Sequence, residues 1–204
     1  MLRTESGFIS GNHYCPDHTK GKAQCYQDLL DAAQHLYYEL PWDSVSIERA
    51  ALKSGIPSQQ AYKLLTDSSD LLKGVIKRGI GRLQSVLYFH VQSQTDVPDR
   101  AARAQKLLDA GVMAVLDDIS FWKLYFFASR DENMRDVLAQ QLQEFDIFLN
   151  LQMISAFRYL QTHSPEDDAM NFRTSLRTLI TESLYTPSQS MLPVKAEKLL
   201  NQFI

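Results

Sequence analysis

Apolar residues recur along the chain with a period of about 3.6 positions, the spacing of one face of an α-helix. Strict alternation of apolar and polar residues, which marks a half-buried strand, is missing from the sequence, as are Asn-Gly hairpin turns. The pattern therefore predicts an all-α protein.

Proline, glycine and capping residues mark the boundaries of the predicted helices. Pro41 ends the first helix and Gly55 the second, while Ser46 and Asp67 stand where amino-terminal caps are expected. Residues 1–19 are predicted to be a flexible tail. The expected helices span residues 22–40, 46–55, 57 or 58–65, 67 to about 90, 99–116, 118–128, 131–162, 165–184 and 192–203.

Composition indicates a globular protein, since 45% of the residues are hydrophobic and 22% are charged. Two cysteines, Cys15 and Cys25, are too few for a disulfide framework, and the amino terminus lacks an apolar core of signal-peptide length. The longest uncharged apolar-rich stretch, 147–157, is far shorter than the ~20 residues that span a bilayer. We therefore expect a soluble, cytoplasmic protein that does not enter a membrane.

Residues 55–72, GIPSQQAYKLLTDSSDLL, form the most informative stretch of the sequence. Together with the preceding helix they predict two short helices joined by a tight, glycine-containing turn. In a helix-turn-helix, the first helix crosses the DNA backbone and the second lies in the major groove. Any small helical bundle can contain this spacing, so the spacing alone is weak support for DNA binding.

The resemblance extends beyond the spacing. Residues 29–73, LLDAAQHLYYELPWDSVSIERAALKSGIPSQQAYKLLTDSSDLLK, resemble without a gap the amino-terminal domain of the TetR family of bacterial transcriptional regulators. Matching features include the Leu-Asp-Ala-Ala start, Trp42, Ser46, the Ala51 and Gly55 that frame the turn, and Tyr62. The stretch FFASRDENMRDVLAQQLQEF, residues 126–145, also resembles a segment of the effector domain of that family.

The resemblance implies a three-helix helix-turn-helix domain at residues 20–66, followed by a helical effector-binding and dimerisation domain at 67–204. It implies a homodimer that pairs through its last two helices, binds a palindromic operator in double-stranded DNA, usually to repress, and responds to a small molecule. Neither a cofactor nor enzymatic activity is expected. The DNA contacts implied by position are Lys20, Lys22, Ser46, Ser58, Gln59, Gln60, Tyr62 and Lys63.

Charge leaves a second interpretation open. The whole chain carries a net charge of −3, and residues 20–82 carry only +2. Pro41, Pro57, Gln59 and Ser68 also depart from the residues usual in the family, and each missing phosphate contact lowers the salt-dependent part of DNA affinity. The alternative is a helical ligand-binding or scaffold protein, derived from the same family, that has lost DNA binding.

Aromatic residues gather in the middle of the chain and suggest an effector pocket, although each one alone is more typical of a helical core. An aromatic wall favours an apolar or flat compound. Asp146, His90 and Arg158 are possible polar anchors, although each one is more typical of a surface or capping position. The candidate ligand-binding residues are Phe121, Trp122, Tyr125, Phe126, Phe145 and Phe148.

Two further features of the sequence each allow more than one interpretation. Apolar stripes on residues 166–184 and 192–203 could pair two subunits or could cap the core of one monomer. His13, Cys15, His18 and Cys25 have the residue types of a zinc site, but their spacing matches no standard finger and no metal site is predicted. The operator, the effector and the direction of regulation do not follow from the sequence.

Overall fold

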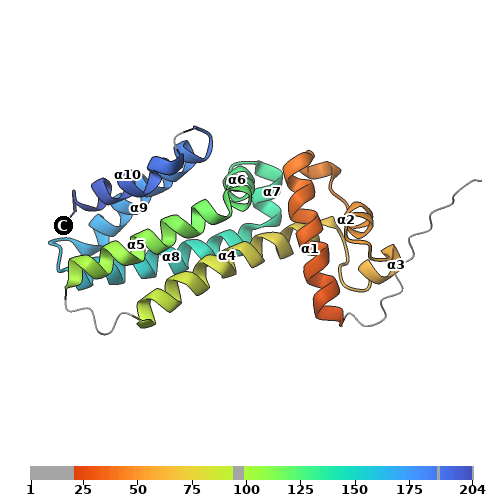
Figure 1. Cartoon of the computed structure of the whole chain (residues 1–204), viewed down its shortest axis with the longest axis horizontal. Coiled ribbons are helices and arrows are strands. Elements are labelled where there is room, and N and C mark those ends of the chain that lie inside the picture. Colours follow the sequence, from red (N-terminus) through yellow and green to blue (C-terminus); the bar gives the residue numbers. More distant parts are fainter. Residues whose placement is uncertain (1–20, 94–98, 188, 204) are drawn as a thin grey trace, which may run out of the picture.

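The structure, a computed structural model, describes residues 21–93, 99–187 and 189–203 and contains only helices and connecting turns within these ranges (Figure 1). The predicted tail lies outside the described residues. The helices are α1 (Lys22–Glu39), η1 (Trp42–Ser44), α2 (Ile47–Ser54), α3 (Ser58–Ala61), α4 (Ser68–Ser93), α5 (Arg100–Asp117), α6 (Ile119–Ala128), α7 (Glu132–Val137), α8 (Ala139–Leu160), α9 (Pro165–Leu184), η2 (Gln189–Met191) and α10 (Leu192–Leu200).

Helices α1, α2 and α3 form a small unit at one end of the molecule (Figure 1). Alanine at three contact positions allows the helices to approach closely, since Ala50, Ala51 and Ala61 are all 0% exposed. Larger apolar side chains of the unit, among them Leu29, Ile47 and Ile56, are also buried. The unit thus combines small residues between its helices with larger apolar residues in its core.

Helix α4 connects this unit to the rest of the molecule (Figure 1). It begins at the predicted place, where the Asp70 N–H donates to the Asp67 carboxylate at 2.9 Å. The Asp70 side chain accepts in turn from the Thr66 N–H at 3.2 Å. Along its 26 residues the helix packs first on α1 and later on α5 and α8, so both parts of the chain share it.

The second part of the chain is a bundle of α5, α6, α8, α9 and α10, in which α5, α6 and α8 contact α4 while α9 and α10 lie on the other side of α5 and α8 (Figure 1). Helix α6 is buried on most of its surface, in keeping with its sequence ISFWKLYFFA. No helix within the described ranges is long and apolar enough to cross a membrane.

Two predicted helix boundaries are wrong. The single helix expected at 131–162 is divided into α7 and α8 at Leu138, because α7 packs on α6 while α8 packs on α5 and α9, and one straight helix cannot follow both directions. The helix expected to reach residue 65 is α-helical only over Ser58–Ala61 and continues as turns.

The apolar stripes of the last two helices are buried within the monomer. On α9 they include Phe172 and Leu176, and on α10 they include Leu192, Ala196 and Leu200. Of the two readings of these stripes, the structure therefore supports capping of the monomer core. Any contact between subunits must use other surfaces.

Helices α4 and α6 approach each other closely at Gly79. A Cβ atom added there would lie 2.1 Å from the ring of Phe121, which is 1% exposed. Gly81, on the same helix, has no atom within 4 Å of such a Cβ.

We expect opposite effects of Gly79→Ala and Gly81→Ala on the free energy of unfolding. Gly81→Ala should stabilise the protein by about 1 kcal/mol, because alanine favours the helix. Gly79→Ala gains the same helix propensity but must displace a buried ring, so it should destabilise by about 1–2 kcal/mol net. Urea unfolding followed by circular dichroism measures both, and equal stabilisation by the two variants would contradict the close packing.

Candidate nucleic-acid interface and ligand cavity

The turn between α2 and α3 has the geometry of a helix-turn-helix. Gly55 adopts a left-handed conformation (φ 71°, ψ 17°), which favours glycine, and the Ile56 N–H donates to the Ala51 carbonyl at 2.9 Å. At the other end of α2, the Ser46 Oγ accepts from the Arg49 N–H at 3.3 Å. Both capping roles expected from the sequence are therefore present.

The start of α3 presents polar side chains to solvent. Ser58, Gln59 and Lys63 are exposed, as expected for a helix that enters a groove. Gln60 differs from the prediction, because it is only half-exposed and its amide donates to the Cys25 Sγ at 3.2 Å. Gln60 therefore helps to hold α3 against α1.

Two of the predicted phosphate ligands contact a carboxylate instead. The Tyr62 hydroxyl, on a side chain that is 49% exposed, donates to Glu48 of α2. Hydrogen bonds from Tyr62 and Ser46 hold the pKa of the Glu48 carboxyl below its ordinary value, so this carboxyl is ionised at neutral pH. A negative charge therefore lies between two groups that the resemblance assigns to phosphate.

Positive charge on this face is sparse. Lys22 is exposed at the start of α1, whereas Lys20 lies outside the described residues. Lys53, on α2, forms an ion pair with Glu39 at 2.8 Å. Lys63 therefore remains the cation nearest to the predicted reading residues in sequence.

Of the four possible zinc ligands, only Cys25 can be placed. His13, Cys15 and His18 lie outside the described residues, and Cys25 is 3% exposed in the core of the small unit. The described ranges contain no cluster of three or more His, Cys, Asp or Glu side chains that could hold a metal ion.

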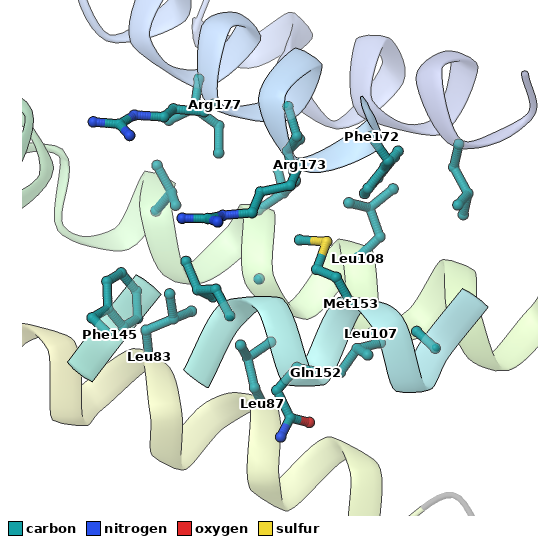
Figure 2. Close-up of a pocket in the computed structure, with 18 of the residues that line it drawn as sticks. Leu83, Leu87, Leu107, Leu108, Phe145, Gln152, Met153, Phe172, Arg173 and Arg177 are labelled. Carbon is teal, nitrogen blue, oxygen red and sulfur yellow. The ribbon is translucent and has the colours of Figure 1, made fainter. Parts of the chain in front are cut away.

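An apolar cavity of about 150 Å³ lies in the second part of the chain, between α4, α5, α6, α8 and α9 (Figure 2). Four of the six predicted ligand-binding residues line it, namely Trp122, Tyr125, Phe126 and Phe145. Phe121 and Phe148 do not line it. Phe121 instead packs against α4 at Gly79, and Phe148 stacks on the outer side of Phe145 at a ring separation of 6.4 Å.

Few polar side chains reach the cavity. Asp146, one of the possible anchors, lines it and forms an ion pair with Arg173 of α9, although its side chain is 48% exposed. Of the other suggested anchors, Arg158 pairs with Glu166 outside the cavity, and the side chain of His90 lies outside the description. Arg173 and Arg177 were missed, and both line the cavity from α9, Arg173 as a partly buried residue and Arg177 as an exposed one.

Burial affects the protonation of the one phenol in the cavity. Tyr125 is 5% exposed, and desolvation together with the charge of Asp146 raises its pKa to about 12. Its hydroxyl therefore keeps its proton at neutral pH and can donate a hydrogen bond.

A polar junction connects the cavity wall to the helix-turn-helix unit. The Asp118 carboxylate caps α6 by accepting from the Phe121 N–H at 3.1 Å, and it accepts from Gln34 of α1 at 3.0 Å. It also forms an ion pair with Arg82 of α4 at 3.0 Å. Arg78 of α4 extends the junction by donating to Gln34 at 2.9 Å and pairing with Asp31 of α1 at 2.7 Å.

The sequence matches no protein-family model and no curated protein. Solved structures, in contrast, resemble the whole fold. A Mesorhizobium loti protein provisionally assigned to the TetR family superposes with a TM-score of 0.70 and 17% identity over 90% of this chain and 96% of its own. A Pseudomonas aeruginosa protein provisionally described as a transcriptional regulator superposes with a TM-score of 0.75 and 14% sequence identity, over 94% of this chain and 95% of its own.

SmeT, the repressor of a multidrug efflux pump in Stenotrophomonas maltophilia, is a third similar structure. Its complex with triclosan gives a TM-score of 0.71 and 16% identity, over 88% of this chain and 91% of its own. At such identities the likeness concerns the fold. The chain has the fold of the TetR family of transcriptional regulators, with an amino-terminal helix-turn-helix followed by a helical domain.

Proposed function

We propose that this protein is a ligand-responsive, DNA-binding transcriptional regulator, a repressor that binds a palindromic operator as a homodimer. The observation that carries the proposal is the helix-turn-helix geometry around Gly55, with Ser58 and Gln59 exposed on α3 and Lys63 exposed in the turn after it. Glutamine can donate to and accept from an adenine edge, and lysine can bind a phosphate. The operator-binding domain would comprise residues 20–66, and residues 67–204 would bind the ligand and the second subunit.

The contact of Glu48 with Tyr62 is compatible with DNA binding only if a phosphate displaces the carboxylate. The Ser46 and Tyr62 hydroxyls donate to an anion in either case, so the exchange keeps both hydrogen bonds. Its cost is the repulsion between the phosphate and the Glu48 charge. This cost predicts a DNA affinity that is modest and sensitive to salt.

The same contact supports the second candidate, a ligand-binding or scaffold protein without DNA binding. In that case the Glu48–Tyr62 hydrogen bond simply joins α2 to the end of α3. The two candidates differ in one property, which is whether the purified protein selects a DNA sequence.

Ligand response would follow from the junction at Asp118. Trp122 and Tyr125 of α6 line the cavity, and the cap of the same helix is hydrogen-bonded to α1. A ligand that moves α6 would therefore change the hydrogen bond that holds α1 at Asp118. In a dimer, this would change the distance between the two copies of α3. The size of the response is limited by the difference in ligand affinity between the two arrangements. The proposed role is regulatory and not catalytic, and the proposed location of the protein is the cytoplasm.

For the homodimer, α9 keeps the role expected from the sequence, while α8 is favoured over α10. Ile147 and Leu151 of α8 are 52% and 62% exposed, and Met170 of the adjacent α9 is 61% exposed. The apolar stripe of α10 is instead buried in the core of the monomer. Exposed apolar side chains on two adjacent long helices fit a four-helix bundle between subunits.

Selection from a random pool of duplex DNA should enrich a palindrome. The logarithm of its affinity should fall linearly with the logarithm of the salt concentration, with a slope of about −0.9 per phosphate contact. Lys63→Ala should make the slope about 2 units shallower, because a dimer loses two contacts. Lys106→Ala, at an exposed residue of α5, removes the same charge elsewhere and serves as the control. Failure to enrich any sequence at low salt would favour the scaffold.

Glu48→Gln should strengthen binding to the selected DNA. Two unit charges about 4 Å apart in water repel by about 1 kcal/mol, so removing one should raise the affinity about fivefold per subunit. Fluorescence anisotropy at constant salt measures the change. The control variant Glu132→Gln of α7 alters the net charge equally and should leave the affinity for DNA unchanged. Weaker DNA binding by Glu48→Gln would contradict the exchange of the Glu48 carboxylate for a phosphate.

The double variant Ile147→Glu, Leu151→Glu should convert the homodimer to a monomer, because charges would replace apolar contacts in the bundle. Sedimentation velocity measures the mass. Met113→Glu, at a residue of α5 that is 49% exposed, provides a matched control that should remain dimeric. A wild-type protein that sediments as a monomer would refute this part of the proposal.

A further inference from the structure

The size of the cavity limits the apolar part of its ligand. An engineered protein cavity of about 150 Å³ with apolar walls holds one benzene molecule, and the cavity here has a volume of about 150 Å³. Its walls include Leu87, Met153 and Phe172 besides the aromatic residues of α6. A space of this volume fits a single aromatic ring or a short alkyl chain.

The charged side chains of the lining lie on one side of this space, whereas Gln152 of α8 lies near Leu87, away from α9 (Figure 2). In Figure 2 the guanidinium groups of Arg173 and Arg177 extend from α9 toward the side where Phe145 lies, away from Phe172. Asp146 and Tyr125 belong to the same group, since the charges of Asp146, Arg173 and Arg177 all act on the Tyr125 hydroxyl. A ligand in the cavity would meet these four side chains at one of its ends.

The two arginines differ in how their charge is balanced. Arg173 pairs with Asp146 and also donates to the Asn150 side chain. Arg177 is exposed to solvent, and its guanidinium lies 5.8 Å from the centre of the Phe126 ring and donates to the Ser129 hydroxyl at 3.3 Å. Within the described ranges no carboxylate lies within 4 Å of Arg177. Asp146, Arg173 and Arg177 together therefore carry one positive charge that is not paired with a carboxylate.

A second donor stands beside that charge. Tyr125 is 5% exposed and lines the cavity, and among the described residues its hydroxyl has no hydrogen-bond partner. Its oxygen is not fully buried, so the hydroxyl can donate to an acceptor that a ligand supplies. The Tyr125 donor and the Arg177 cation, which has no ion-pair partner, together favour a ligand with an anionic oxygen.

We propose that the cavity binds a small monocarboxylate, an inference that rests on the proposed ligand-responsive function. Its apolar part, a single aromatic ring or a short chain, occupies the space between α5, α6 and α8, and its carboxylate accepts from Arg177 and from the Tyr125 hydroxyl. One net positive charge matches a monoanion, whereas a dianion such as a phosphate monoester would be repelled by Asp146. A cationic ligand would face two arginines and only one carboxylate.

Fluorescence of the cavity tryptophan tests the inference without DNA. The chain has two tryptophans, Trp42 and Trp122, so Trp42→Phe leaves the indole that lines the cavity as the single reporter. The probes are 3-phenylpropanoate and its neutral counterpart 3-phenylpropanamide, with calorimetry as a second measurement. We expect the acid to bind on the order of tenfold more tightly than the amide.

Arg177→Gln should abolish this preference by weakening the acid to the level of the amide, while the affinity for the amide stays unchanged. Arg135→Gln, at an exposed residue of α7 that does not line the cavity, should leave both affinities unchanged. Equal binding of the two probes, a preference that survives Arg177→Gln, or no binding of either probe to the folded protein would each overturn the inference. Acid binding by a protein that selects no DNA would sustain the ligand class while refuting the regulator.

Discussion

The Asp118 carboxylate is the point on which the arrangement of the two parts of the chain depends. It caps α6, accepts from Gln34 of α1 and pairs with Arg82 of α4, so three helices meet at one anion. A helix cap is ordinarily a local feature worth about 1 kcal/mol. Here the same oxygen atoms also fix the small helix-turn-helix unit against the bundle.

Features that arise from neighbouring residues could be predicted from the sequence. The all-α fold, the cap at Ser46 and the left-handed Gly55 follow from periodicity and from single residues with strong backbone preferences. Features that arise from contacts between distant segments could not. The break at Leu138 reflects two packing directions, and the burial of the α10 stripe depends on which surface of the bundle remains open.

The cavity shows the same limit. An aromatic cluster identified α6 as a wall, but it could not distinguish Tyr125, which faces the cavity, from Phe121, which faces α4, although both are buried. Arg173 and Arg177 were missed because charged residues on a helix usually face solvent. Only the fold brings them to the apolar space.

The surface formed by α2 and α3 combines a well-formed turn with few positive charges. Its shape is set by buried alanines and glycine, which cost little electrostatically, whereas its affinity depends on a few exposed side chains. Shape and affinity are therefore separable, so substitutions at Glu48 or Lys63 can alter DNA binding without altering the fold.

The contact of Gly79 with Phe121 also limits how α6 can move. Because the ring rests on bare backbone, α6 cannot slide along α4 without withdrawing Phe121 from its place. A rotation of α6 about this contact, which lies near the amino end of a helix of 10 residues, would leave the ring in place. Such a rotation would convert a large displacement at the distal end of α6 into a small and opposite one at Asp118, where the helix is hydrogen-bonded to α1.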